Sequence, residues 1–282
     1  MSLYTRILER ISEKFQIVIL RKETFKRLAS SSKHVQEEHQ FHQLIAELVK
    51  VLPNNDLSIF DIGCNNGWST VRYAKYFHWA RFHMFEAMPE IQEIAASNIQ
   101  KHKLEARCTL HRFALSDEPG TTQFFVSNMP TRTDWRKNAS DSSSILRPKL
   151  HTEVFMDVAF ESQVDVQVKR LHDLISTGVT PLPHFIHLDV QGAELKVLEG
   201  MGEFIEDVHA VWLEVSNVEL YEKQPLAPDI AHFMTKKGFT LKLDFVNEVF
   251  GDQLWLNPKF APGHDARRHG GPAGSPVRTG RQ

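Results

Sequence analysis

The chain has 282 residues, of which 41% are hydrophobic and 24% are charged, and its formal net charge is −2. These proportions are ordinary for a soluble globular protein of one large or two small domains, and the near-neutral charge gives no general attraction to nucleic acid or to a membrane. Two cysteines are too few for a disulfide framework, and no apolar run approaches the roughly 18 residues that span a bilayer. The start also lacks the apolar core of a secretion signal, so we expect a cytoplasmic protein without a nucleic-acid partner.

The first 54 residues carry two helical patterns. Apolar residues recur at helical spacing over 3–20, with basic residues beside them. Such a basic amphipathic helix either packs against its own domain, which is the commoner case, or makes peripheral contact with a membrane surface. A second helical pattern over 41–49 ends at Pro53, and the run Ser30–Ser32 predicts a break between the two helices. We interpret this part, residues 1–54, as a helical cap that leads into the main domain.

A short apolar strand pattern then ends at an acid and passes through a glycine-containing loop into a helical segment. The loop residues are Asp61, Gly63, Asn65, Asn66 and Gly67. Glycine permits a close backbone approach to a ligand, and the free N–H groups of the following helix point to the same place. The loop is not a dinucleotide fingerprint, because Asn65 stands where the second glycine is required, and it is not a P-loop. It therefore predicts a ligand-binding turn, or else a tight strand-to-helix turn of the kind found in any α/β protein.

From residue 57 onward, strand and helix patterns alternate. Strands are expected at 58–62, 82–86, 109–115, 185–190 and 209–215, helices at 68–77, 89–101, 193–200 and 227–237, and a late hairpin at 240–246 and 253–256. Apolar strands that alternate with helices predict a mostly parallel sheet covered on both faces. The expected fold class is α/β, with a Rossmann-like, doubly wound, mostly parallel sheet that ends in an antiparallel hairpin.

Residues 120–168 interrupt this alternation within the main domain, which we place at 55–258. Strand patterns at Gly120–Ser127 and Val164–Val168 flank a polar, turn-rich stretch. Long irregular segments inside compact domains are commonly functional lids or disordered, so we interpret 120–168 as an insertion that covers an acceptor. The stretch 259–282 is rich in glycine and arginine and poor in large apolar residues, which predicts a disordered tail.

Acidic residues after the second and third strand patterns could contact a ligand at the same edge of the sheet. Glu86 ends the second pattern about 20 residues after Gly67, where Rossmann-like folds place an acid on ribose hydroxyls. The alternative is a surface acid that begins a turn. Ser116 and Asp117 follow the third pattern and either contact an adenine or form an Asx turn without a ligand.

A further motif runs from His184 to Glu194. A buried strand pattern brings Asp189 to the carboxyl edge of the sheet, and His187, two residues earlier, shares its strand face. Either side chain could take a proton from an acceptor hydroxyl, although His187 could instead be satisfied within the sheet. Glu194 lies in the first turn of the next helix, where an acid also favours the helix dipole. Asp189, Glu194 and Glu214 could approach one another and bind Mg²⁺, but their spacing does not demand a metal.

Together these motifs resemble the FkbM family of methyltransferases over about residues 57–256. The resemblance rests on Asp61–Gly67, Phe85–Pro89, Asn98, Ala114–Asp117, Ser143–Ser144, Leu188–Glu194 with Val197–Gly200, and Glu214–Val215. It implies a class I fold with a seven-stranded sheet that binds S-adenosylmethionine (SAM), and methyl transfer to a hydroxyl of a sugar, polyketide or other natural product. By the same resemblance the methionine part of SAM would lie at 61–67, the ribose at Glu86 and the adenine near Ser116 and Asp117. Asp189 and Glu194 would line the transfer site.

Two positions depart from the family pattern, which commonly has lysine where this chain has His187 and glutamate where it has Gln191. These changes concern the acceptor chemistry more than SAM binding. We therefore expect a SAM-dependent O-methyltransferase with Asp189 or His187 as the base and a small-molecule or glycan acceptor. One alternative is an NAD-dependent oxidoreductase, which Asn65 disfavours. Another is a SAM-binding or interaction protein without catalysis, which the two departures motivate. Neither the acceptor nor the oligomeric state is encoded in a local motif.

Overall fold

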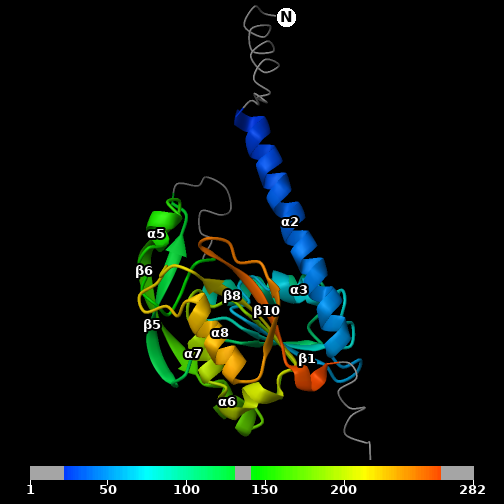
Figure 1. Ribbon diagram of the computed structural model, residues 1–282. Helices are drawn as coiled ribbons and strands as arrows, with labels where there is room; N and C mark the ends of the chain where they lie inside the picture. Colours follow the sequence, from blue (N-terminus) through cyan, green and yellow to red (C-terminus); the bar gives the residue numbers. More distant parts are fainter. Residues whose placement is uncertain (1–21, 131–140, 262–282) are drawn as a thin grey trace, which may run out of the picture. The chain divides into compact units, whose positions relative to one another are not determined.

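The computed structural model describes residues 22–130 and 141–261, with side chains from residue 35 onward (Figure 1). In chain order its elements are α2 Lys22–Val51, β1 Ser58–Ile62, α3 Trp68–Ala74, β2 Arg81–Phe85, α4 Pro89–Lys101, β3 Cys108–His111, β4 Ala114–Leu115, β5 Gly120–Asn128, α5 His151–Val154, β6 Ala159–Lys169, α6 Leu171–Ser176, β7 Phe185–Leu188, α7 Glu194–Glu199, η2 Gly202–Asp207, β8 Ala210–Ser216, α8 Ala227–Lys236, β9 Thr240–Asp244, β10 Phe250–Leu256 and η3 Pro258–Phe260.

The helix α2 is continuous, so the break expected at Ser30–Ser32 is wrong. Serine lowers the stability of a helix interior by less than about 0.7 kcal/mol relative to alanine, and the residues on either side of the run are good helix formers. The chain divides into two compact units, 1–46 and 47–282, and the role of the N-terminal part as a cap stays a prediction. The amphipathic segment 3–20 and the chain beyond residue 261 lie outside the described residues.

The second unit is built on a seven-stranded sheet with the order β3-β2-β1-β7-β8-β10-β9. The strands β1, β2, β3, β7 and β8 run parallel to one another, whereas β10 is antiparallel to both β8 and β9. This confirms the α/β fold class and the late antiparallel hairpin. The chain moves outward from β1 to β3 and then returns to place β7 on the other side of β1. The reversal creates a switch point between β1 and β7, where sheets of this kind bind ligands at the carboxyl ends of their strands.

Helices cover both faces of the sheet. On one face, α6, α7 and α8 pack their apolar residues against those of β1, β7 and β8 around Phe60, Ile186 and Leu213 (Figure 1). On the other face, the ring of Tyr73 in α3 meets that of Phe185 in β7 edge to face, with 5.3 Å between centroids. All five residues of β1 are buried, as expected for a central strand enclosed on both sides.

The strand expected at 109–115 divides between two sheets, so its prediction as one strand is wrong. After β3 the chain bends at Arg112 and Phe113, and β4 enters a three-stranded sheet of order β4-β6-β5. Beside the bend, the Arg112 guanidinium donates to Gln92 and Glu93 of α4, and after it Ala114 and Leu115 pair with β6. Hydrophobic periodicity alone does not register such a contact.

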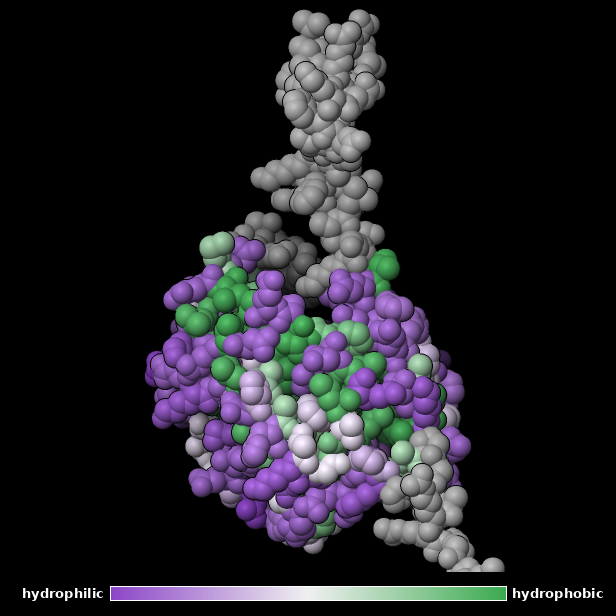
Figure 2. Space-filling model, in the orientation of Figure 1, coloured by the Kyte–Doolittle hydropathy of each residue, from purple (hydrophilic) through white to green (hydrophobic). Residues whose placement is uncertain are grey.

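The segment 120–168 is not irregular throughout, because it contains two strands. Its strands β5 and β6 form a long antiparallel hairpin, and β6 pairs in parallel with β4. Residues 131–140 lie outside the described residues. In the orientation of Figure 1, polar residues occupy much of the surface and apolar residues gather over α5 and β10 (Figure 2).

Candidate active site

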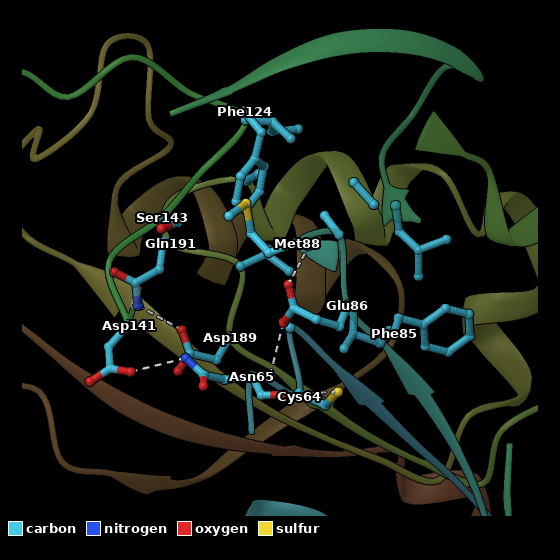
Figure 3. A pocket seen from close by; sticks show the side chains of 18 of the residues that line it. Cys64, Asn65, Phe85, Glu86, Met88, Phe124, Asp141, Ser143, Asp189 and Gln191 are labelled. Atoms are coloured by element: carbon cyan, nitrogen blue, oxygen red, sulfur yellow. Dashed lines mark hydrogen bonds between the residues drawn. The ribbon is translucent and has the colours of Figure 1, made fainter. Parts of the chain in front are cut away.

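A cavity of about 360 Å³ lies at the carboxyl ends of β1, β2 and β7, against β4 and β5 (Figure 3). The lining residues are Ile62, Gly63, Cys64, Asn65, Asn66, Trp68, Ser69, Phe85, Glu86, Ala87, Met88, Phe113, Ala114, Leu115, Phe124, Asp141, Ser143, Ile145, His187, Asp189, Val190, Gln191 and Ala193. The cavity therefore occupies the switch point between β1 and β7, and it gathers predicted residues from both halves of the sheet.

The loop after β1 is fixed by its own backbone. The N–H groups of Gly63 and Cys64 both donate to the carbonyl oxygen of Phe85 at 3.0 Å. Gly63 has a φ of 76°, and a Cβ atom at this position would lie 1.8 Å from the carbonyl oxygen of Asp189. Only glycine satisfies both the left-handed backbone and this close approach. Gly63 thus brings the end of β1 against the end of β7.

The second half of the loop is held by amide side chains. Asn65 is also left-handed, with a φ of 47°, a conformation that asparagine tolerates better than most residues. The Asn66 side-chain oxygen accepts from the N–H of Trp68 at 3.0 Å, and Asn98 donates to the Asn66 carbonyl at 2.9 Å. Gly67 has a φ of 76° and precedes α3, but it does not line the cavity.

Glu86 lies at the cavity wall with its carboxylate held by two backbone donors. One oxygen accepts from the N–H of Met88 at 2.8 Å and the other from the N–H of Asn65 at 3.0 Å (Figure 3). Burial raises the pKa of this carboxyl, and the backbone hydrogen bonds oppose that rise. A carboxylate offers about four acceptor sites, so two backbone bonds leave room for a ligand hydroxyl.

Asp61 and His187 form a buried pair beneath the cavity. Asp61 is fully buried, does not line the cavity and accepts hydrogen bonds from Ser69 and Thr70 at the start of α3. Its other oxygen lies 2.9 Å from Nδ1 of His187. Burial opposes both charges, but the contact outweighs it, lowering the pKa of Asp61 and raising that of His187. His187 lines the cavity, and its Nδ1 is already hydrogen-bonded to Asp61.

Asp189 lies in the cavity wall, on the loop that follows β7. Its Oδ1 accepts from the side-chain N–H of Gln191 at 2.7 Å (Figure 3). Burial raises the pKa of Asp189, against the opposing effects of that hydrogen bond and of the His187 charge. The same nitrogen of Gln191 also lies 3.2 Å from Glu214 on β8. The structure therefore brings Asp189 and His187 to one wall, and it adds Gln191 to them.

Glu194 lies behind the cavity wall. One of its oxygens accepts from the N–H groups of Val190 and Gly192, both at 3.1 Å. Burial raises the pKa of this carboxyl to about 7. Glu194 does not line the cavity, so its position suits holding the 189–192 loop rather than contacting an acceptor.

Ser116 and Asp117 also do not line the cavity. Asp117 accepts from the hydroxyl of Ser116 at 2.7 Å and pairs with the Lys196 ammonium of α7 at 3.1 Å. The residues just before them, Phe113 to Leu115, supply the wall instead. The structure does not bring this pair to the other predicted cofactor residues.

Two polar lining residues that the sequence did not mark as ligands come from the middle of the 120–168 insertion. Asp141 accepts from the Asn65 side chain at 3.0 Å, which ties the insertion to the loop after β1 (Figure 3). The hydroxyl of Ser143 accepts from the N–H of Ser127 at 2.9 Å. Ser143 belongs to the family resemblance, which is the one signal that could have found it. No local spacing marks Asp141.

Residues 61–241 match the Methyltransferase FkbM domain. The chain belongs to the FkbM methyltransferase family. The 2-O-methyltransferase NoeI of Sinorhizobium fredii (strain NBRC 101917 / NGR234) is 32% identical over 213 residues, which is 76% of this chain and 84% of that protein. Methyltransferase sdnD of Sordaria araneosa is 26% identical over 210 residues, 68% of this chain and 77% of that one. The crystal structure of Methyltransferase FkbM from Methylobacillus flagellatus KT aligns with a TM-score of 0.46 and 13% identity over 72% of this chain and 44% of that chain.

The FkbM match begins at Asp61 and ends within β9, so it includes every described residue that lines the cavity. This FkbM methyltransferase therefore carries its candidate site inside the family domain. Within 22–130 and 141–261, no group of three or more His, Cys, Asp or Glu side chains is arranged to hold a metal ion. Over the same ranges, no helix combines the length and the apolar character needed to cross a membrane.

Proposed function

We propose that this FkbM methyltransferase uses SAM to methylate a hydroxyl oxygen of a small-molecule or glycan acceptor. The observation that carries the proposal is Glu86, whose carboxylate is fixed in the cavity wall by the N–H of Asn65 from the glycine loop. When bound, SAM supplies a sulfonium-activated methyl group for in-line displacement by an oxygen. The roughly 360 Å³ cavity lies within the size range of small-molecule sites.

The charges around the cavity support a cationic ligand. The described lining residues include the carboxylates of Glu86, Asp141 and Asp189, and none of them is lysine or arginine. A sulfonium is attracted to such a wall, whereas the pyrophosphate of a dinucleotide is repelled by it. The same argument disfavours an NAD-dependent oxidoreductase, in agreement with the asparagine at position 65.

In this proposal Glu86 accepts from the ribose hydroxyls and the backbone of 63–66 lies along the methionine part. Glu86 is already oriented by two backbone donors, so binding requires little reorganisation of its side chain. Phe113, Ala114 and Leu115 offer an apolar wall for the adenine, in place of Ser116 and Asp117. Phe124, Ser143 and Ile145 bring the 120–168 insertion to the cavity, which supports its role as the acceptor cover.

Asp189 is the base in this proposal. The charge of His187 is stabilised by Asp61, and an imidazolium cannot accept a proton. Asp189 keeps one oxygen outside its hydrogen bond with Gln191, and burial raises its pKa toward the range in which a base works best near neutral pH. The relative NoeI is named a 2-O-methyltransferase, which supports oxygen as the methylated atom.

Calorimetric titration of the whole chain with SAM and with NAD tests the cofactor. We expect saturable binding of SAM alone, whereas binding of NAD in preference to SAM would overturn the proposal. Transfer of labelled methyl from SAM to a panel of sugars and hydroxylated natural products then tests the reaction. In Asp189→Asn, SAM should still bind and turnover should fall by about 10²-fold or more, in the range of general-base catalysis. If only nitrogen or carbon atoms are methylated, then the proposal that the methylated atom is oxygen is wrong.

A further inference from the structure

The side chain of Gln191 lies between two carboxylates and a tyrosine. Its Nε2 is 2.7 Å from Oδ1 of Asp189 and 3.2 Å from Oε2 of Glu214. Its Oε1 is 3.1 Å from the hydroxyl of Tyr221, which is 1% exposed. The backbone of Gln191 has a φ of 55°, a left-handed conformation that is uncommon for a residue other than glycine. Residues held in such conformations cluster at functional sites, where the surrounding structure enforces them.

The donors and acceptors of this group fit in one orientation of the amide. Two carboxylates face one end of it, and only the NH₂ end can donate to both. The oxygen end then needs a donor, which the Tyr221 hydroxyl provides. That hydroxyl also lies 2.7 Å from the carbonyl oxygen of Ser142, so its single hydrogen is shared between two acceptors. The Gln191 carbonyl is fixed separately, because it accepts from the hydroxyl of Ser144 at 2.7 Å.

We propose that Gln191 is a positioning residue whose amide, oriented by Tyr221, holds Asp189 and Glu214 side by side and presents Asp189 to the cavity. Only the function of the held carboxylate as the base rests on the proposed methyl transfer. The contacts themselves do not depend on it. A glutamate at this position would set a third carboxylate against the other two.

Because several charged groups surround the Gln191 amide, its hydrogen bonds influence the ionisation of Asp189 and Glu214. Asp189 is influenced by the positive charge of His187 and by the negative charges of Asp61 and Asp141. Burial raises the pKa of Glu214 well above its ordinary range, and the charges of Asp189, Asp252 and Glu194 raise it further, while the Gln191 hydrogen bond lowers it. The amide is thus a neutral donor among several acids, and it favours their ionised forms.

Gln191→Glu tests this inference, because it keeps the shape of the side chain and exchanges the amide for an acid. A carboxyl that is half-buried beside other carboxylates has a raised pKa in the folded state. The unfolded chain then releases the proton first, so stability falls as pH rises from about 4.3 toward the folded pKa. Each unit of that rise changes the unfolding equilibrium tenfold. The control is Gln163→Glu on β6, where the side chain is exposed.

Urea unfolding of the whole chain at pH 5, 6, 7 and 8 is the measurement. We expect the unfolding constant of Gln191→Glu, relative to wild type, to increase at least tenfold between pH 5 and pH 8, with no such trend in Gln163→Glu. Combination with Asp189→Asn should reduce the trend, because one of the interacting carboxylates is gone. A pH-independent loss, or no loss, would overturn the inference, since a steric role alone carries no pH dependence.

SAM titration of the wild-type chain separates the two proposals. If SAM binds and the Gln191→Glu loss is independent of pH, then the positioning role fails while the methyltransferase proposal stands. If the pH-dependent loss is found and SAM does not bind, then the positioning role stands and the proposed reaction fails.

Discussion

The two loops that form the cavity are held in different ways. The first half of the loop after β1 is fixed by neighbouring backbone, because the N–H groups of Gly63 and Cys64 donate to the Phe85 carbonyl. The loop after β7 is fixed by side chains, since Gln191 is bonded by Ser144, Tyr221 and Glu214 from 47, 30 and 23 positions away in the sequence. A backbone-held loop needs particular residue types at fixed spacing, whereas a side-chain-held loop needs partners that only folding brings together.

The loop after β1 can therefore vary little at Gly63, whereas the loop after β7 depends on polar partners. At Gly63 the strict requirement is space, because the carbonyl of Asp189 lies where a side chain would begin. At Gln191 the requirement is the direction of an amide between acceptors and a donor. Substitutions on the two sides should therefore fail for different reasons, through a clash on one side and through charge on the other.

The largest effect is expected from Gly63→Ala. A left-handed alanine costs about 1–2 kcal/mol, and here the new methyl group would also meet the Asp189 carbonyl, so we expect a loss of more than about 4 kcal/mol in the free energy of unfolding. Gly178→Ala is the matched control, because Gly178 has a φ of 72° and no atom within 4 Å of its added Cβ. It should cost about 1–2 kcal/mol, from backbone strain alone. If urea unfolding finds the same loss of unfolding free energy in both variants, then the close contact between Gly63 and the Asp189 carbonyl does not exclude a side chain at position 63.

The next largest effect concerns the pair beneath the cavity. His187→Leu leaves the buried Asp61 carboxylate without its cationic partner, which should cost about 3–5 kcal/mol at pH 6. The raised pKa of His187 gives stability that is present below about 6.5 and is lost as pH rises through the folded value. The lowered pKa of Asp61 gives stability that is present above about 3.9 and is lost as pH falls.

The contribution of the pair to stability is therefore greatest between about pH 4 and 6.5. Unfolding free energies of wild type and His187→Leu from pH 5 to pH 9 are the check. The difference between the two proteins should narrow as pH rises above about 6.5. A difference that stays constant over this range would show that His187 acts through packing, for example against Tyr73, rather than through its charge.

The backbone-held side is also the side that the sequence predicts well. Gly63, Asn65 and Glu86 lie in the cavity wall, whereas Asp61 and Gly67 of the same predicted loop do not. Glycine at a left-handed turn and an acid at a strand end are local requirements that a sequence can show. The order of the large sheet follows from the same alternation of strands and helices. On the other side, Asp189 and His187 reach the wall as expected, but Glu194 turns inward to the N–H groups of its own loop.

The remaining differences arise where a distant contact decides the local structure. The strand expected at 109–115 divides because Ala114 and Leu115 pair with β6, more than 50 positions later, rather than with β2. Asp117 does not line the cavity and instead pairs with Lys196, 79 positions later. Asp141 enters the cavity wall through Asn65, 76 positions earlier. None of these pairings has a periodicity or a spacing that can be detected in a single sequence.

A smaller effect, on SAM affinity, is expected from Glu86→Gln, together with some loss of stability because the new NH₂ group would face the backbone N–H of Asn65 or Met88. The amide keeps the shape but loses the charge and one acceptor, and charged hydrogen bonds contribute about 1.5–3 kcal/mol, so affinity should fall about 10–100-fold. Glu90→Gln is the control, because Glu90 is an exposed acid in the first turn of α4. Calorimetry should find the control at wild-type affinity. Unchanged SAM affinity in Glu86→Gln would show that Glu86 does not bind the ribose hydroxyls.

The smallest effect is expected at the residues that the sequence placed near the adenine. Asp117 and Lys196 are 34% and 41% exposed, so their ion pair should contribute less than about 1 kcal/mol to stability. Because Asp117 does not line the cavity, Asp117→Asn should bind SAM as the wild type does, and so should Lys196→Met. The two variants separate an ion pair from a ligand contact. Weaker SAM binding in Asp117→Asn alone would return Asp117 to the cofactor, whereas equal weakening in both would mean that the ion pair aligns the neighbouring wall at Leu115.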